Sequence, residues 1–207
     1  MVMFRKNKQD HRQALDIMRK YVVGEMTAED FWEVYKNNIV MQRILIRDRK
    51  RPDESILKIN ADNMLSVIDI TKFSHRTAVH RIVANYFSRR KEKLDYFNAE
   101  RNLLSDFYAV FPSYADTIDI DRLYEMWLAI PSDIPESKKL NFLRNELKEL
   151  FIYKKRRPRW VQNADWPIID GIPYVFDHQE TAPEGYEKYY FYDPKDTTKQ
   201  IIIEQCE

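Results

Sequence analysis

The pattern of apolar residues changes near Trp160, and this change limits the folds that the chain can adopt. Before Trp160, apolar residues recur at intervals of three and four, which is the period of amphipathic helices. After it, short runs of aromatic and β-branched residues alternate with turn residues, which is typical of strands. We therefore predict an α+β protein: an N-terminal bundle of six to seven helices with a small C-terminal antiparallel β meander packed on it.

Charge divides the chain at the same place. From Trp160 onward there are ten acidic residues and three lysines, a net charge of −7, whereas the rest holds 31 Lys and Arg against 23 Asp and Glu. Between the halves, residues 154–159 carry five positive charges in six positions. We predict a helical domain (1–153), a basic hinge (154–159) and an acidic antiparallel β module (160–207). Such opposite charges attract the two parts to each other or leave an acidic face for a basic partner.

Composition sets the class of protein. Of 207 residues, 44% are hydrophobic and 14% are aromatic, which is typical of a folded chain with a real core. The single cysteine, Cys206, excludes an internal disulfide framework and suits a reducing compartment. The first residues lack the apolar region of a signal peptide, and no stretch reaches the length of a membrane span. We predict a cytoplasmic protein that does not enter the membrane.

Several short signals place the ends of the predicted helices. Gly24 is expected to end a first helix over about 8–23, and Thr27, with acidic residues following it, is expected to cap the next. Further helices are expected over about 95–111 and 119–128. Asp116, Asp119 and Asp121 lie at the start of the last of these, where carboxylates stabilise the helix N-terminus. The final helical stripe runs from Leu140 to Phe151.

The clearest helix of the chain is expected to begin at a Ser74 cap. Ala78, Val79, Ile82, Val83, Tyr86 and Phe87 form one apolar stripe along it. We predict that the opposite face is a solvated basic surface, made of His75, Arg76, His80, Arg81, Arg89 and Arg90. His75 and His80 are five residues apart, which places them on different helix faces and argues against a shared metal.

The usual catalytic signatures are missing from the sequence. It has no glycine-rich phosphate loop, no nucleophile elbow, no His-Glu-x-x-His helix and no pair of cysteines. His178 follows Asp177 on an expected strand, but no nucleophile lies nearby. We therefore predict no catalytic, cofactor-binding or metal-binding residues, and an enzyme whose site is assembled from distant residues is our third hypothesis.

The last fifty residues contain the signals of a small sheet. Asp170-Gly171 between isoleucines predicts a hairpin with a type I′ turn, because that turn needs positive φ at both central residues. Strands are expected at Tyr174–Phe176, Lys188–Asp193 and Lys199–Gln205. Together they predict a meander of three or four strands, which is marginal on its own.

A spaced motif runs through this module. Its members are Trp160, Gln162, Trp166, Pro167, Gly171, Pro173, Phe176 and Gln179, in the pattern WxQxxxWPxxxGxPxxFxxQ. The motif resembles a C-terminal module of the immunity proteins of bacterial polymorphic and contact-dependent toxin systems, over about fifty of the 207 residues. From the residues themselves we expect the two tryptophans and Phe176 in the core, the prolines at strand ends, and the glutamines bonded to backbone edges.

The resemblance implies a non-enzymatic cytoplasmic protein that neutralises a cognate toxin by occluding it. The acidic module suits a basic partner such as a nuclease. Candidate contact residues are the acids expected at turns and strand ends: Asp165, Asp170, Asp177, Glu180 and Glu184. The alternative is a nucleic-acid-binding regulator that uses the basic helix 75–91 and the hinge 154–159. Nucleic acid is the less favoured partner, because the neighbouring acids can pair with the hinge. The sequence does not indicate an oligomeric state.

Overall fold

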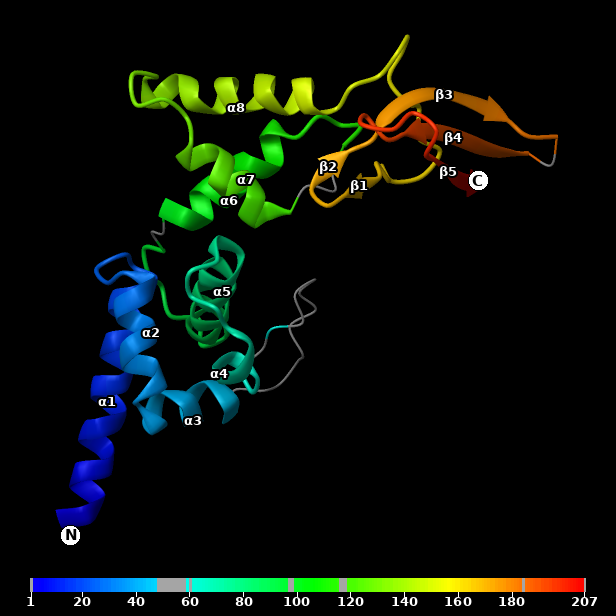
Figure 1. Cartoon of the computed structure of the whole chain (residues 1–207). Helices are drawn as coiled ribbons and strands as arrows, with labels where there is room; N and C mark the ends of the chain where they lie inside the picture. Colours follow the sequence, from blue (N-terminus) through cyan, green and yellow to red (C-terminus); the bar gives the residue numbers. More distant parts are fainter. Residues whose placement is uncertain are drawn as a thin grey trace. The chain divides into compact units, whose positions relative to one another are not determined.

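The chain folds into helices followed by a small sheet (Figure 1). The computed structural model describes residues 2–47, 59, 61–96, 99–115, 119–183 and 185–206, with side chains from Lys8 onward. Within these ranges there are eight helices and five strands, which confirms the predicted α+β class. The chain divides into two compact units, residues 1–104 and 105–207.

Unit 1 is helical. Its helices are α1 (Val2–Val22), α2 (Ala28–Lys36), α3 (Ile39–Arg47), α4 (Met64–Val67), α5 (Phe73–Arg89) and the start of α6 (Ala99–Val110). The Thr27 side chain accepts a hydrogen bond from the Asp30 amide, so the predicted cap of α2 is confirmed. Gly24 has a φ of 83°, the left-handed conformation that favours glycine after a helix.

The helix α5 differs from its prediction at both its start and its polar face. It begins at Phe73, one residue before the expected Ser74 cap, and Ser74 is buried in the first turn. The predicted apolar stripe is buried throughout. However, Arg76 and His80 are also buried, so the prediction of a solvated basic face was wrong for both. Since α5 contacts α1, α2 and α3, packing covers more of its circumference than one stripe.

Arg76 is held by several polar partners inside unit 1. Its Nε lies 2.5 Å from a carboxylate oxygen of Glu100 in α6. Its Nη1 donates to the carbonyl oxygens of Ile70, at 3.3 Å, and Thr71, at 2.9 Å. A buried charge is costly unless it is paired and hydrogen bonded, and here both conditions hold. Arg76 therefore joins α5 to the preceding loop and to the first turn of α6.

Unit 2 contains the rest of α6, then α7 (Ile120–Leu128) and α8 (Glu136–Leu150). Asp119 caps α7 by accepting from the Asp121 amide, as predicted, while Asp116 lies outside the described residues. The strands are β1 (Ile168–Ile169), β2 (Ile172–Pro173), β3 (Val175–Thr181), β4 (Tyr186–Tyr192) and β5 (Gln200–Cys206). The pair β1-β2 is a separate hairpin, and β3-β4-β5 form an antiparallel sheet.

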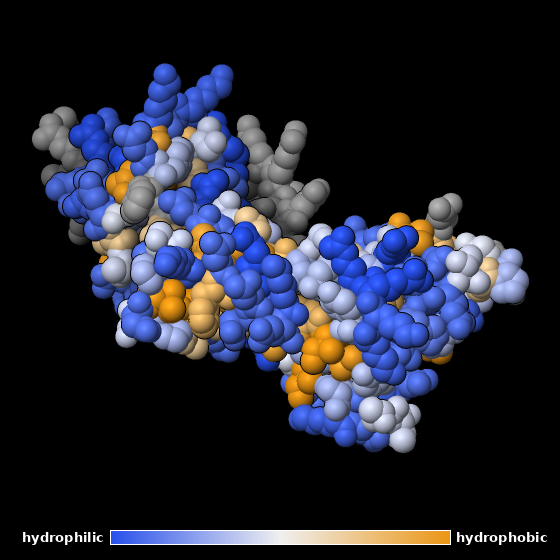
Figure 2. Space-filling model, turned by 90° about the horizontal axis from the view of Figure 1, so that it is seen from above, coloured by the Kyte–Doolittle hydropathy of each residue, from blue (hydrophilic) through white to orange (hydrophobic). Residues whose placement is uncertain are grey.

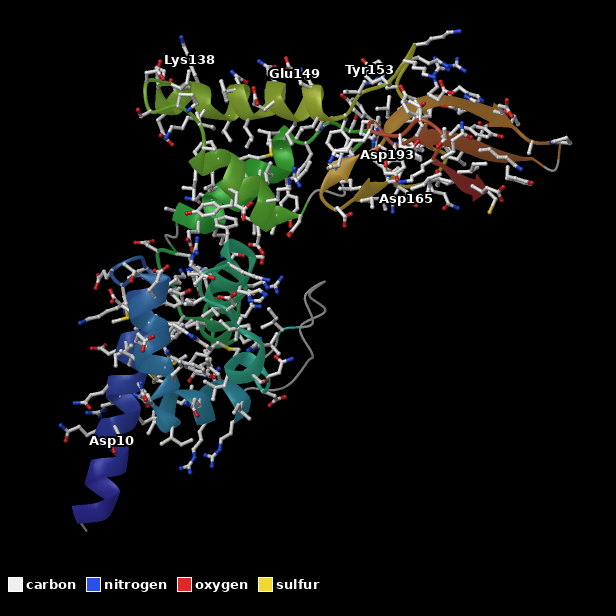
Figure 3. The ribbon with its side chains drawn as sticks, in the orientation of Figure 1. Asp10, Lys138, Glu149, Tyr153, Asp165 and Asp193 are labelled. Carbon is white, nitrogen blue, oxygen red and sulfur yellow. The ribbon has the colours of Figure 1, made fainter. Side chains whose placement is uncertain are left out.

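The basic residues 154–159 lie within unit 2. The Lys154 amide donates to the Phe176 carbonyl at 3.0 Å, and the Phe176 amide donates to the Ile152 carbonyl at 2.9 Å. This stretch therefore runs beside the edge of β3 after leaving α8, near Tyr153 in Figure 3. The division between the compact units lies earlier, between Leu104 and Ser105. The predicted hinge at 154–159 marks a change in composition and charge along the sequence. The division between the compact units instead marks a change in which residues pack together.

The surface is mostly hydrophilic on the face seen in Figure 2, where hydrophobic residues form patches among polar ones. In the part of the chain that the structure describes, no helix combines the length and apolar character needed to cross a membrane.

Candidate functional site

Residues 159–163 cross one face of the β3-β4-β5 sheet, and we call them the crossing segment. It is bonded to the first two strands through side chains. The Arg159 amide donates to Gln179 Oε1 in β3 at 2.8 Å. The Tyr189 hydroxyl in β4 donates to the Arg159 carbonyl at 2.9 Å and accepts from the Val161 amide at 3.0 Å.

The same segment is bonded to β5. Gln205 Oε1 accepts from the Gln162 amide at 3.0 Å, and Gln205 Nε2 donates to the Asn163 carbonyl at 2.9 Å. The Gln162 side chain donates to the Cys206 carbonyl at 2.6 Å. The prediction that Gln162 and Gln179 satisfy backbone groups is confirmed. Gln205 was missed, although its place in phase with Ile201 and Ile203 on one strand face was a signal.

The aromatic members of the motif hold this arrangement together. Trp166 is 1% exposed, its ring contacts Phe151, Phe176 and Phe191, and its indole N–H donates to the Tyr174 carbonyl at 2.7 Å. Phe176 is fully buried as well, so both core predictions are confirmed. The sheet thus packs through Trp166 on Phe151, the residue that follows α8.

Trp160 differs from Trp166 because it is only partly buried, which corrects its placement in the core. Its ring lies over Tyr189, with 4.4 Å between centroids, and near Phe191 at 6.0 Å. Its indole N–H donates to the Tyr114 carbonyl at 3.1 Å. Trp160 therefore packs against the sheet while part of its side chain stays exposed.

The hairpin of the motif has the predicted geometry. Asp170 and Gly171 have φ values of 49° and 72°, so both central residues of the turn are left-handed. A side chain at Gly171 would meet the guanidinium of Arg122, which occupies that space. Pro167 directly precedes β1, and Pro173 ends β2, in agreement with their expected places at strand ends.

Of the four predicted acidic contact residues that the structure describes, two lie together on one strand. Asp177 and Glu180 lie on β3, whereas Asp165 lies in the loop before β1 (Figure 3) and Asp170 lies in the hairpin turn. Asp165 and Asp170 are exposed and form no ion pair with any described residue. Glu184 lies outside the described residues.

Asp177 and Glu180 both have close polar partners. Lys154 Nζ is 2.7 Å from Asp177, and this hydrogen bond holds the pKa of the Asp177 carboxyl below its usual value. The His178 ring lies between the two acids, 3.2 Å from Asp177 and 3.3 Å from Glu180. The Tyr190 hydroxyl lies 3.2 Å from Glu180. The predicted acidic surface is therefore partly neutralised on β3.

The face of the sheet opposite the crossing segment, which we call the outer face, is rich in tyrosine. Side chains alternate along β4, so Tyr186, Tyr190 and Tyr192 point away from the buried Tyr189 and Phe191. Tyr190 stacks on His178 with 4.4 Å between ring centroids. Its partner on β5 is Ile202, which is 49% exposed. The sequence analysis missed this surface, although the run Tyr189-Tyr190-Phe191-Tyr192 contains the alternation.

The basic stretch 154–159 is mostly solvent-exposed. Lys154 pairs with Asp177, and its Nζ lies 4.6 Å from the ring centre of Tyr192. Lys155, Arg156 and Arg157 are exposed and form no ion pair within the described ranges. Their positive charges are therefore not cancelled by the acids of the β module.

The two histidines of α5 have separate partners. His75 Nδ1 accepts from the Asp69 amide at 2.9 Å, and His80 Nε2 lies 3.3 Å from the Val22 carbonyl oxygen. Among the residues whose side chains are described, no group of three or more His, Cys, Asp or Glu is placed to hold a metal ion.

No protein-family model matches this chain, and neither the curated proteins nor the solved structures include a significant match to it.

Proposed function

We propose that the chain is a non-enzymatic binding protein that contacts a basic protein partner through the outer face of its C-terminal sheet. The carrying observation is the cluster of partly exposed tyrosines on β4 beside the exposed Ile202 on β5. Tyrosine is enriched at protein interfaces, because it supplies a large apolar ring and a polar hydroxyl at little cost in conformational entropy.

The outer face is held in one geometry by contacts between its own side chains. The His178 and Tyr190 rings stack with an interplanar angle of 4°. Lys188 pairs with Glu204 at 3.2 Å, and its Nζ lies 5.2 Å from the ring centre of Tyr186. Ordering the side chains before binding reduces the entropy lost on association.

Charge supports a basic partner. The residues from Trp160 onward carry a net charge of −7, and Asp165 and Asp170 are exposed without an ion pair in the described structure. Such a charge attracts a positively charged protein over distances of about a Debye length, roughly 8–10 Å at physiological salt. Together with the motif from Trp160 to Gln179, these features support an immunity protein that occludes a cognate toxin, for example a nuclease.

The decisive experiment compares Tyr190→Ala with a matched control. If a toxin-like gene lies beside this one, its product is the partner to test, and the measurements are its dissociation constant and the protection of cells that express it. Tyr190→Ala should weaken binding by at least about tenfold, the effect of an interface hot spot, and reduce protection. Tyr108→Ala removes a 66%-exposed tyrosine of α6 in the same unit and should leave both unchanged. Equal affinities for Tyr190→Ala and wild type would exclude the outer face as the contact.

The contribution of charge is measured separately. Neutralising Asp165, Asp170 and Glu180 together should slow association several-fold at low salt while leaving the fold intact, because rim charges act mainly on the association rate. The difference from wild type should disappear at about 1 M salt, where the Debye length is roughly 3 Å. An unchanged association rate would mean that these acids do not attract the partner.

The second candidate is a nucleic-acid-binding regulator. It retains one supporting observation, the three exposed cations Lys155, Arg156 and Arg157. Its other proposed surface, the helix 75–91, exposes fewer basic side chains than predicted, because Arg76 and His80 are buried. Binding to duplex DNA that weakens steeply with salt would favour this candidate.

A further inference from the structure

A pocket of about 400 Å³ lies in unit 2, beside the crossing segment. It is formed by the loop after α6, at Ser113 and Tyr114, and by Arg157, Arg159, Trp160 and Asn163. None of the described residues that line it is acidic. Its size falls in the range of small-molecule sites, roughly 300–1,000 Å³.

The pocket contains several hydrogen-bond donors without partners. The guanidinium groups of Arg157 and Arg159 and the side-chain polar atoms of Ser113, Tyr114 and Asn163 make no hydrogen bond with any described residue. Burial raises the pKa of Tyr114, so its hydroxyl remains protonated at neutral pH. Two arginines, a serine, a tyrosine and an asparagine line one hollow. Such a donor-rich lining suits an anion with several oxygens, since arginine pairs with phosphate through two parallel hydrogen bonds.

The main chain beneath these donors is fixed. Arg159 is bonded through its amide to Gln179 and through its carbonyl to Tyr189, while its guanidinium stays exposed. Pro158, between the two arginines, is buried. Gln205 holds the Asn163 carbonyl. The donors are therefore presented from a rigid base, which lowers the entropic cost of binding.

Trp160 adds an aromatic wall to the same pocket. One side of its ring lies on Tyr189 and Phe191, and the ring is only partly buried. Its indole N–H is already bonded to the Tyr114 carbonyl, which fixes the ring orientation. Indole rings bind nucleobases by stacking without regard to base identity.

We propose that this pocket binds a nucleoside monophosphate, with the phosphate at Arg157 and Arg159 and the base against Trp160. The site uses residues distinct from those of the outer face, so it stands independently of the proposed protein partner. The phosphate group can belong to a free nucleotide or to the end of a nucleic-acid strand. A nucleic-acid strand would also contact the neighbouring cations outside the pocket, whereas a free nucleotide would not.

The test measures binding of adenosine 5′-monophosphate, inorganic phosphate and adenosine to the full chain by calorimetry. The monophosphate should bind at least about tenfold more tightly than either fragment, because it uses both the arginines and the ring. Arg157→Gln with Arg159→Gln should lower its affinity by at least about tenfold. The matched control, Lys155→Gln with Arg156→Gln, removes the same charge from exposed neighbours outside the pocket and should change the affinity less than about twofold.

Trp160→Leu separates the ring from the arginines. It should lower the affinity for the monophosphate by a larger factor than the affinity for inorganic phosphate, and so reduce the preference between them. The proposal fails if the two double variants lose affinity equally, or if adenosine monophosphate binds no more tightly than phosphate. It also fails if a ten-nucleotide oligoadenylate without a 5′ phosphate binds more tightly than the monophosphate and loses affinity in both double variants, which would indicate an extended nucleic-acid surface instead.

Discussion

The Tyr189 hydroxyl donates a hydrogen bond to the Arg159 carbonyl, 2.9 Å away, across thirty positions of sequence. The same oxygen accepts from the Val161 amide at 3.0 Å. One side chain at the centre of the sheet thus holds two backbone groups of the crossing segment, one on each side of Trp160. The position of Trp160, between these two residues, depends on this contact.

Tyr189→Phe should therefore loosen the crossing segment without emptying the core. Losing the hydroxyl should lower the free energy of unfolding by about 1 kcal/mol, because Arg159 and Val161 are exposed enough for water to replace part of the bond. Amide hydrogen exchange at Val161 should accelerate. Tyr190→Phe is the control, since its hydroxyl bonds an exposed carboxylate, and equal exchange at Val161 in both variants would contradict the role of Tyr189.

The two tryptophans of the motif should differ in their contribution to stability. Trp166→Ala should lower the free energy of unfolding by about 3–5 kcal/mol, because it leaves a cavity among Phe151, Phe176 and Phe191. Trp160→Ala should cost clearly less, since its ring is only partly buried. Urea unfolding midpoints at constant slope measure the difference. A larger loss for Trp160 than for Trp166 would contradict the structure.

Breaking the Arg76–Glu100 ion pair should strongly lower the stability of unit 1. Arg76→Ala should cost about 3 kcal/mol or more, because it leaves the Glu100 carboxylate and two carbonyl groups without their partner. Arg89→Ala, near the exposed end of the same helix, should cost less than about 1 kcal/mol. Thermal unfolding, followed by circular dichroism, measures the loss of stability in the two variants. Similar losses of stability would show that burial of Arg76 does not matter.

Buried His80 should make unit 1 less stable in acid. Burial lowers the pKa of His80 below its ordinary value of 6.5, and its Nδ1 has no partner within the described residues. The unfolded chain therefore binds the proton more readily than the folded one. Above about pH 6.5, His80 is neutral in both states and does not lower the free energy of unfolding. Below that pH the free energy of unfolding falls progressively, until the pH reaches the lower pKa of His80 in the folded state.

The measurement compares urea midpoints at pH 7.5 and pH 5.0 in wild type and His80→Gln. The loss between the two pH values should be smaller in His80→Gln, because carboxylate protonation remains but the histidine contribution is gone. His11→Gln removes an exposed histidine of α1, keeps His80 and should lose as much as wild type. A loss in His80→Gln equal to that of wild type would contradict the prediction.

The sequence by itself determined the features that arise within a few residues. Thr27 and Asp119 cap their helices because the bonded amides lie three and two residues away. The Asp170-Gly171 turn follows from the positive φ that these residue types tolerate. The apolar stripe of α5, the strands and the backbone-bonding roles of Gln162 and Gln179 were predictable for similar reasons, since residue type and local period specify them.

Only the tertiary structure decided which polar groups are buried and what they contact. Arg76 lies seven residues before Val83 and His80 seven before Phe87, so the helical period places both beside the apolar stripe of α5, but only the packing decides that these polar side chains are buried. The partners of Tyr189 and Gln205 are 28 to 43 residues away in sequence, and no local pattern announces them. Burial and long-range hydrogen bonding depend on elements that approach from elsewhere in the chain, and a local period contains no information about those neighbours.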